Sequence, residues 1–507
     1  MNLSVFLRRF SSISLKVLIF IIIFLSSFLY FGTNYVRENF GLIPMDSIIF
    51  TITVPLEGTE NSKVFEFIKE CFIPTVFTTI AIWFVLTIVP RINYKIEYSF
   101  NDEKKEFLIK PKKWVVAVAY IMPIFILLGC INHSTSKVEL YEHFKDLSTD
   151  SKFIEKNYIE PKTTKITFPE EKRNLIYIFM ESMETSYMST KLGGNMAKNL
   201  IPGLTELARE NIHFSNKTEF GGAIQVAGTS WTIGSMVANT CGLPLKLPIE
   251  NNSMGKFQKF LPQIHTLGDI LESEGYNQTL IVGSNSVYGG RKNYFEQHGN
   301  YTVKDWNTAQ EEELIPKGYK VWWGYEDEYL YDYAKIQLSE LAARDEPFNL
   351  TLLTVDTHFT DGYVCELCDE ESVKQYDNVI SCADRQIVEF ISWFQKQDYY
   401  KNTTIIITGD HLTMDKNYIK NTDNQRTIFN TFINSAVSTD KTKNRIFTVM
   451  DMFPTTLAAM GVTIEGERLG LGTNLFSGIK TLPEVYGIND FDKELGLRSS
   501  FYNSKLK

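Results

Sequence analysis

The sequence has little that would suit a nucleic-acid-binding protein. Its 507 residues carry a net charge of -9, and they contain no basic stripe and no recognised nucleic-acid-binding motif. The chain also lacks internal repeats and low-complexity tracts beyond residue 172. We therefore expect no nucleic-acid partner and one uninterrupted domain in the later part of the chain. Because single cores stop growing near ~250–300 residues, we also expect a second structural part.

Charged residues are missing from three long apolar stretches, except at their ends. These stretches cover residues 16–31, 71–89 and 114–131. Each approaches the ~18–20 residues that a helix needs to cross a bilayer. Buried core helices are the alternative, and the absence of internal charge argues against them. The first stretch also resembles a signal peptide, but the two that follow favour a retained anchor. The sequence therefore predicts a three-span transmembrane anchor over residues 1–131.

Basic residues are scarce in the loop between the first two spans and frequent in the loop between the second and third. The earlier loop holds Arg37, Lys63 and Lys69 among six acidic residues. The later loop holds seven basic residues, which are Arg91, Lys95, Lys104, Lys105, Lys110, Lys112 and Lys113. Because Lys and Arg gather on the cytoplasmic side, the N-terminus and the later loop are predicted to be cytoplasmic. Everything after residue 131 is then extracytoplasmic.

Cysteine is rare, and four of the six cysteines follow the predicted spans. These four are Cys241, Cys365, Cys368 and Cys382. Outside the cytoplasm disulfides can persist, so two disulfides are favoured, with Cys368–Cys382 and Cys241–Cys365 as the expected pairs. Metal binding or free thiols are the alternatives. Three of the cysteines could ligate zinc, but no nearby histidine completes a spacing typical of structural zinc.

After a polar stretch over 132–172, which is predicted to be a linker or a helical collar, the pattern changes. Short apolar runs rich in β-branched residues recur at 175–180, 279–283, 348–355 and 403–409. Continuous hydrophobicity predicts strands that are covered on both faces, as in a mainly parallel α/β sheet. We therefore expect residues 173–507 to form an extracytoplasmic α/β domain with a central, mainly parallel sheet.

Polar residues follow directly on three of these runs. Glu181 follows the first, His358 lies just beyond the third, and Asp410 and His411 follow the fourth. Ligands bind beyond the carboxyl ends of strands in open α/β sheets, so these residues are predicted to converge. Two carboxylates and an imidazole suit Mn²⁺ or Zn²⁺. Taken singly, each residue could instead be a helix cap or an ordinary buried polar group.

The Gly-rich stretch 219–245 adds small hydroxyl residues before a predicted helix. Thr229 could supply a hydroxyl that a divalent cation activates, with the first turn of the helix facing a phosphate oxygen. Its alternative role is to cap a helix that begins near Trp231. Ser230 and Thr232 lie close enough that the sequence does not exclude either as the nucleophile.

Five stretches carry a family resemblance. In order they are NLIYIFMES, GTSWTIGSMVANTCGLPL, LGDILESEGY, TVDTHFTDG and IIITGDHL. Together they resemble the membrane phosphoglycerol transferases of the alkaline phosphatase and sulfatase superfamily over residues 173–475. The nearest group is the phosphoglycerol transferases of osmoregulated periplasmic glucans, and lipoteichoic acid synthases are more distant. The sulfatase signature Cys-x-Pro-x-Arg is missing, so sulfate-ester hydrolysis is not expected.

The resemblance implies a role for individual residues. Thr229 becomes the nucleophile, and Glu181, Thr229, Asp410 and His411 become the ligands of one divalent cation, Mn²⁺, with Zn²⁺ and Mg²⁺ as alternatives. Arg291 and His358 match positions that contact the substrate phosphate. A surface salt bridge is the alternative for Arg291. Asp327 falls in a matching WGxxD motif and is carried over as a substrate-binding residue.

The function implied by the resemblance is a transferase of the inner (plasma) membrane with a periplasmic catalytic domain. It moves phosphoglycerol from phosphatidylglycerol, through a phosphoglycerol-threonine, to a glycan or a related envelope acceptor, and it releases diacylglycerol. Two alternatives are kept, a phosphoethanolamine transferase acting on lipid A or a glycan, and a catalytically inactive membrane scaffold. The presence of all the expected ligands argues against the scaffold.

Overall fold

The computed structural model forms two compact units. The first comprises the described residues up to 138, and the second comprises those from 146 onward. The residues whose structure is described are 3–40, 61–88, 94–100, 103–109, 113–138, 146, 148–246, 260–415, 418–419 and 424–505.

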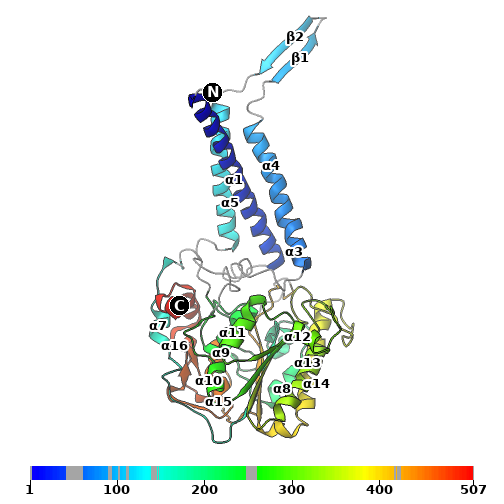
Figure 1. The fold of residues 1–507 in the computed structure, drawn as a ribbon, viewed down its shortest axis with the longest axis vertical. Coiled ribbons are helices and arrows are strands. Elements are labelled where there is room, and N and C mark those ends of the chain that lie inside the picture. The colour runs from blue at the N-terminus through cyan, green and yellow to red at the C-terminus, as the bar shows by residue number, and fades with distance from the viewer. Residues whose placement is uncertain are drawn as a thin grey trace. The chain divides into compact units, whose positions relative to one another are not determined.

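The first unit consists of long helices and one hairpin (Figure 1). Its elements are α1 (Leu3–Phe40), α3 (Asn61–Phe67), a π-helical turn (Ile68–Phe72), α4 (Ile73–Thr87), β1 (Tyr94–Phe100), β2 (Glu103–Ile109) and α5 (Lys113–Val138). Polar contacts join the helices, since the Thr33 and Ser134 hydroxyls lie 2.7 Å apart and the Trp83 indole N–H donates to the Lys16 carbonyl at 3.0 Å.

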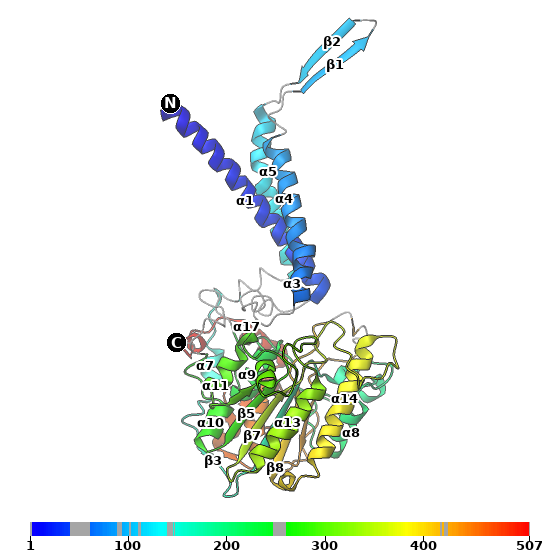
Figure 2. The same ribbon diagram turned by 45° about the vertical axis from the view of Figure 1, so that its right-hand side comes forward.

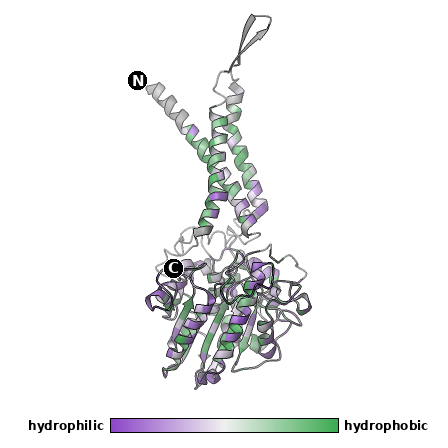
Figure 3. Ribbon diagram, turned by 90° about the vertical axis from the view of Figure 1, so that its right-hand side faces the viewer, coloured by the Kyte–Doolittle hydropathy of each residue, from purple (hydrophilic) through white to green (hydrophobic). Residues whose placement is uncertain are grey.

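Two helical stretches of this unit are long and apolar enough to cross a membrane. They are Ser14–Glu38, within α1, and Val64–Thr87, which runs through the π-helical turn into α4. Apolar residues cover much of these helices (Figure 3). They correspond to the first two predicted spans. The third predicted span, 114–131, is helical as part of α5, and its membrane crossing stays a prediction.

A six-stranded sheet organises the second unit (Figure 2). Its strand order is β6–β5–β7–β4–β8–β9. The strands are β4 (Asn174–Met180), β5 (Asn277–Val282), β6 (Thr302–Lys304), β7 (Phe348–Leu353), β8 (Thr403–Gly409) and β9 (Asn430–Ile433). All neighbours pair in parallel except β8 and β9, which are antiparallel. The expected mainly parallel sheet is therefore confirmed, as a mixed sheet with one antiparallel edge strand.

Helices cover both faces of this sheet. Helices α9 (Thr232–Cys241), α10 (Leu267–Ser273), α11 (Arg291–Gln297) and α15 (Met452–Ala459) lie on one side, and α8 (Pro202–Glu210), α13 (Asp327–Ala342) and α14 (Gln375–Phe394) lie on the other (Figure 1). The remaining helices are α7 (Phe153–Asn157), α12 (Trp306–Glu311), α16 (Leu482–Tyr486), α17 (Ile488–Gly496) and α18 (Ser500–Lys505).

Strand β4 shows why the sheet needs a layer of helices on each face. Side chains alternate along a strand, and here both sets are apolar. Leu175 and Phe179 belong to the core under α9 and α15, whereas Ile176 and Ile178 belong to the core under α13 and α14. A strand of this kind is stable only between two layers, which places it at the centre of the domain.

Residues 148–172 are more than a linker. Ile154, on α7, is buried in the core of the second unit. Strand β3 (Ile166–Thr167) pairs with β10 (Thr463–Ile464), close to the far end of the chain. From residue 148 onward the predicted linker or collar is therefore part of the second unit, because apolar side chains such as Ile154 are buried in the core of that unit.

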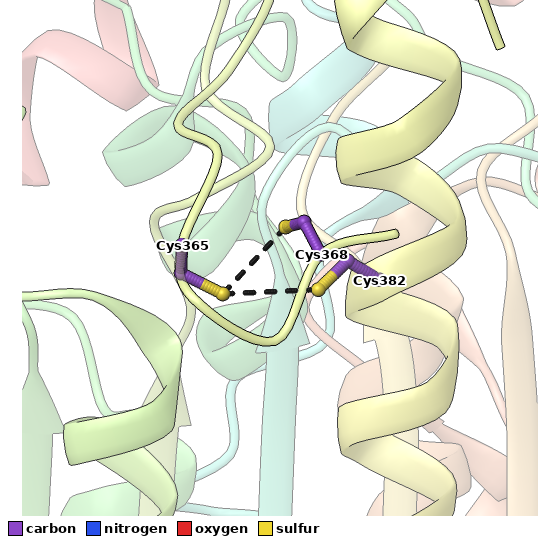
Figure 4. Close-up of side chains that lie close together, drawn as sticks. All are labelled: Cys365, Cys368 and Cys382. Carbon is purple, nitrogen blue, oxygen red and sulfur yellow. Dashed lines mark hydrogen bonds between the residues drawn. The ribbon is translucent and has the colours of Figure 1, made fainter. Parts of the chain in front are cut away.

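The cysteines do not form the expected disulfides. All six lie in the described part of the chain, and each is a free thiol. The Cys365 sulfur lies 3.6 Å from that of Cys368 and 3.7 Å from that of Cys382 (Figure 4). Cys241 is instead the last residue of α9, where it is buried next to Tyr294. The expected pair Cys241–Cys365 is therefore wrong, because the two residues belong to different parts of the domain.

Candidate active site

The carboxyl ends of two neighbouring strands, β4 and β8, carry the acidic residues predicted from the sequence. Strand β4 pairs with β8 in parallel register, with Met180 opposite Gly409. The next residues along the two strands, Glu181 and Asp410, therefore start their loops side by side. Gly409 leaves no room for a side chain, since a Cβ there would lie 1.8 Å from the Met183 carbonyl oxygen.

Glu181, Asp410 and His411 form one buried cluster. His411 Nε2 lies 3.5 Å from Glu181 Oε1 and 3.4 Å from Asp410 Oδ2. Exposed fractions are 3% for Glu181, 0% for Asp410 and 1% for His411. One donor atom from each residue lies within 4.8 Å of the other two. The structure thus brings together the three residues that were predicted as metal ligands besides Thr229.

Backbone contacts fix which atoms face the centre of the cluster. Asp410 Oδ1 accepts hydrogen bonds from the amides of Ser182 and His411, both at 2.7 Å. Asp410 Oδ2 is buried and accepts no hydrogen bond within the described residues. His411 Nδ1 lies 2.8 Å from the Leu412 carbonyl oxygen, which accepts from an Nδ1–H. Burial alone would lower the pKa of His411, but the charges of Asp410 and Glu181 raise it above its ordinary value. In the deprotonated ring the Nε2 lone pair faces the two carboxylates.

This charge distribution fits a divalent cation. Burial, and then the charge of Glu181, raise the pKa of Asp410 to about 7. Burial opposes ionisation of Glu181 too, but His411, whose Nε2 lies 3.5 Å from Oε1, holds the pKa of the Glu181 carboxyl below its ordinary value. Two buried carboxylates and an imidazole lone pair that face one point repel one another unless a positive charge lies between them. The donor set, two oxygens and one nitrogen, is common for such ions.

Thr232, rather than Thr229, supplies the hydroxyl at this cluster. Thr232 Oγ1 lies 3.3 Å from Glu181 Oε2 and 3.4 Å from His411 Nε2. The Thr229 hydroxyl is fully buried and donates to the Val226 carbonyl at 2.8 Å. It also accepts from the Val226 amide at 3.1 Å, so it closes a turn. The structure therefore does not bring Thr229 to the predicted metal ligands.

The local backbone explains this difference of three residues. Gly228 has a φ of 76°, and a Cβ there would meet Pro244 and Leu245 at less than 3.0 Å. The chain turns at this glycine, and α9 begins only at Thr232, with Trp231 as the N-cap residue. Thr232 is thus the first residue of the helix, where the backbone N–H groups have no acceptor within the helix and favour an anion.

Arg291 and His358 lie around the same cluster. The charge of Glu181 acts on the pKa of both side chains, although burial has the larger effect and lowers both. Arg291, the first residue of α11, donates to Ser284 Oγ at 3.1 Å and to the Asn285 carbonyl at 2.8 Å. Its Nε is buried without a hydrogen-bond partner in the described structure. It is therefore no surface salt bridge, and a donor remains for a ligand.

The His358 ring is held in place by two contacts. Its Nδ1 lies 2.7 Å from the Phe359 carbonyl oxygen, and its ring centroid lies 4.7 Å from that of Trp323. The lowered pKa keeps the imidazole neutral at pH 7, with Nε2 as the acceptor when Nδ1 carries the proton.

Asp327 forms hydrogen bonds with the backbone of the residues just before His358. Its carboxylate accepts from the Val355 amide at 2.7 Å and from the Asp356 amide at 3.3 Å. In return its own amide donates to Asp356 Oδ2 at 3.2 Å. Both carboxylate oxygens are thus used by the loop that follows β7. These bonds give Asp327 a positioning role, and its expected contact with substrate stays a prediction.

A buried ion pair that was not predicted from the sequence lies beside the cluster. Glu184 is fully buried and accepts from Arg426 Nε at 2.8 Å, and it also accepts from the Thr413 amide at 3.2 Å. Arg426 further donates to the Thr413 carbonyl at 2.9 Å. The pair holds the segment just beyond His411. Its only sequence signal was a second glutamate three positions after Glu181.

The comparisons with known proteins agree with this architecture. Phosphoglycerol transferase I of Citrobacter koseri is 30% identical over 399 residues, which cover 75% of this chain and 48% of that protein. The same enzyme of Salmonella choleraesuis gives the same identity and coverage. This chain therefore spans about half the length of the curated relatives it matches.

The fold also matches that of an integral membrane protein. Lipooligosaccharide phosphoethanolamine transferase A from Neisseria meningitidis aligns with a TM-score of 0.52 and 14% identity, over 92% of this chain and 87% of that chain. The sulfatase family matches residues 173–462, which include all the strands of the central sheet. Since this match covers more than half of the sequence, the chain belongs to the sulfatase family.

Proposed function

We propose that this protein is a membrane-anchored phosphoglycerol transferase with Thr232 as its nucleophile. The observation that carries the proposal is the position of the Thr232 hydroxyl, 3.3 Å from Glu181 and 3.4 Å from His411, at the first residue of α9. The names of the relatives from Citrobacter koseri and Salmonella choleraesuis support phosphoglycerol as the transferred group. Thr232 takes the role that the sequence predicted for Thr229.

A divalent cation fits between Glu181, Asp410 and His411, and we propose Mn²⁺, with Zn²⁺ and Mg²⁺ as alternatives. The unpaired Asp410 Oδ2 and the inward Nε2 of His411 are the atoms that would hold it. Once bound, such an ion acts as a Lewis acid and lowers the pKa of a neighbouring hydroxyl. The Thr232 hydroxyl, 3.4 Å from His411 Nε2, is close enough to the proposed cation site for its pKa to be lowered in this way.

The proposed donor is phosphatidylglycerol. Thr232 Oγ1 attacks the phosphorus, a new phosphorus–oxygen bond forms, and the bond to diacylglycerol breaks. The departing oxygen takes up the proton that the threonine hydroxyl loses, so diacylglycerol leaves as a neutral alcohol. In the second step an acceptor hydroxyl attacks the phosphoglycerol-threonine, and Thr232 regains its proton.

Arg291 and His358 would bind the phosphate during both steps. Arg291 offers the buried Nε–H that has no partner in the described structure. Its guanidinium keeps its charge despite burial, since Arg remains protonated in proteins. Neutral His358 is held by the Phe359 carbonyl and the Trp323 ring, so little reorganisation is needed when charge develops on the phosphoryl oxygens.

The anchor would place the active site close to its lipid donor. Two helical stretches have the length and composition of membrane spans, and we propose α5 as the third. Its exposed side chains include Phe125, Leu128 and Ile131, as expected for contact with lipid. We propose an inner-membrane location with the catalytic domain in the periplasm, and a glycan or related envelope acceptor.

The decisive experiment incubates the purified full chain with Mn²⁺ and phosphatidylglycerol in detergent micelles. Released diacylglycerol is measured, and the peptide covering residues 219–245 is mapped by tandem mass spectrometry for a glycerol-phosphate adduct. We expect diacylglycerol and an adduct on Thr232. An identical incubation with phosphatidylethanolamine tests the other donor. Reaction with that lipid alone would make the protein a phosphoethanolamine transferase, and no reaction with either would revive the scaffold.

A further inference from the structure

A second cluster of potential ligands lies outside the candidate active site. Cys365 and Cys368 lie on the loop between His358 and α14, and Cys382 lies within α14. Figure 4 shows the three side chains converging from these two segments. Cys365 and Cys382 are almost fully buried, at 5% and 1% exposure, and Cys368 is half-buried. The three sulfur atoms lie within 4.8 Å of one another.

The distances between the sulfurs match a tetrahedral metal site. Thiolates bind zinc at about 2.3 Å, and two such ligands at the tetrahedral angle lie about 3.8 Å apart. The two distances from Cys365, 3.6 and 3.7 Å, are close to this value. A disulfide would instead bring one pair to about 2.05 Å. The Cys-x-x-Cys spacing of Cys365 and Cys368 is also common among zinc ligands.

The surroundings favour sulfurs that accept hydrogen bonds. The Gln386 side-chain amide, one turn beyond Cys382 on α14, lies with Nε2 3.7 Å from the Cys365 sulfur and 3.5 Å from the Cys382 sulfur. An amide NH₂ only donates, so both sulfurs are acceptors here, as thiolates are. The adjacent sequence contains Glu366, Asp369, Glu370 and Glu371, which makes the loop attractive to cations.

We propose that Cys365, Cys368 and Cys382 together bind one Zn²⁺ as three thiolate ligands, at a site separate from the catalytic cation. Binding forms three Zn–S bonds and releases the thiol protons to solvent, and water from solvent takes the fourth position. The half-buried Cys368 marks the side open to that water.

A metal ion bound at this site would link α14 to the loop that follows His358, because Cys382 lies on α14 and the other two cysteines lie on that loop. Arg385, on α14, also contacts this segment, through a bond to the Leu367 carbonyl at 3.0 Å and an exposed ion pair with Asp369 at 3.1 Å. The inference does not depend on the transferase reaction, because the three cysteines are not in the candidate active site.

Cobalt substitution of the wild-type protein tests the proposal directly. The purified full chain is stripped with chelator under reducing conditions and titrated with Co²⁺. Thiolate ligands give an intense charge-transfer absorption in the near ultraviolet, whereas the oxygen and nitrogen ligands of Glu181, Asp410 and His411 do not. We expect this absorption to saturate at about one Co²⁺ per chain, and Zn²⁺ to abolish it.

Variants then identify the ligands. Cys368→Ser should lose at least about nine tenths of the absorption, and Cys130→Ser, in α5, should keep it. Metal analysis of Asp410→Asn protein should find about one Zn²⁺ per chain, which Cys368→Ser then removes. Peptide mapping under non-reducing conditions then shows whether the three cysteines are free thiols or form a disulfide. A disulfide between any two of the three cysteines without the absorption, or three free thiols without it, would overturn the proposal.

Discussion

The Oγ1 atom of Thr232 lies 3.3 Å from Oε2 of Glu181, although the two residues come from different segments, the start of α9 and the end of β4. We predict that Thr232→Ala lowers the rate of diacylglycerol release by at least about a thousandfold, as expected when a nucleophile is removed. Thr232→Ser should keep measurable activity because it retains a hydroxyl.

Thr229→Ala is the matched control for this experiment. Its hydroxyl only closes a turn on Val226, so we expect the rate to fall less than about tenfold, with some loss of thermal stability. If Thr229→Ala abolished release while Thr232→Ala did not, Thr229 would be the nucleophile and this geometry would not be the reactive one.

Removing one carboxylate should weaken cation binding. Asp410→Asn keeps an acceptor for the amides of Ser182 and His411 but loses the negative charge at Oδ2. We expect the Kd for Mn²⁺, measured by isothermal titration calorimetry, to rise at least about a hundredfold. The exposed Asp440→Asn is the control and should leave the Kd unchanged. Equal affinity in the two variants would show that Asp410 holds no cation.

Asp327 should affect turnover without affecting the cation. Its carboxylate binds the amides of Val355 and Asp356, just before His358, so Asp327→Ala releases this segment. We expect kcat to fall about tenfold or more, while the Kd for Mn²⁺ stays the same. Asp327→Asn, which keeps one acceptor oxygen, should recover part of kcat. A change confined to KM for phosphatidylglycerol would instead favour direct contact with substrate.

His213 should make stability depend on pH. Burial, and then the charge of Lys443, lower the pKa of His213 from 6.5 to about 4. Between those values the unfolded chain binds more protons than the folded one, so this stability is complete above pH 6.5 and is lost as the pH falls towards 4. A shift of this size corresponds to about 3 kcal/mol.

The measurement is the Tm of the detergent-solubilised protein at pH 7.5 and pH 5. The Tm of the wild type should fall more over this interval than that of His213→Gln, which has no group that titrates there. The remaining titrating groups are common to both proteins and cancel in the comparison. An equal fall in Tm for both would show that folding does not lower the pKa of His213.

Much of the cluster could be predicted because it depends on strand ends. Apolar runs rich in β-branched residues marked β4 and β8, and polar residues at the ends of neighbouring parallel strands must lie close together. This reasoning found Glu181, Asp410 and His411 without knowledge of the strand order. The antiparallel pairing of β9 could not be found in this way, because a short buried strand carries no sign of its direction.

Which hydroxyl residue within 229–232 lies at the cluster could be decided only from the backbone conformation. Three hydroxyl residues occur in four positions, and which one faces Glu181 depends on the turn at Gly228 and on the residue at which α9 begins. Sequence patterns locate helix ends only to within a few residues. The pairing of Cys241 with Cys365 failed for a related reason, since it required the relative positions of α9 and the loop before α14.

The strand order also determines when the site can exist during folding. Strand β4 leaves the ribosome before its two neighbours, β7 and β8, and Ser182 donates to Asp410 across 228 positions of sequence. Contacts of such long range form late, after the intervening chain has been ordered. A nascent chain that ends before β8 therefore has only Glu181 of the three clustered residues, and its central strand β4 has one side unpaired. Such an intermediate is open to aggregation, and a metal ion cannot yet hold it together.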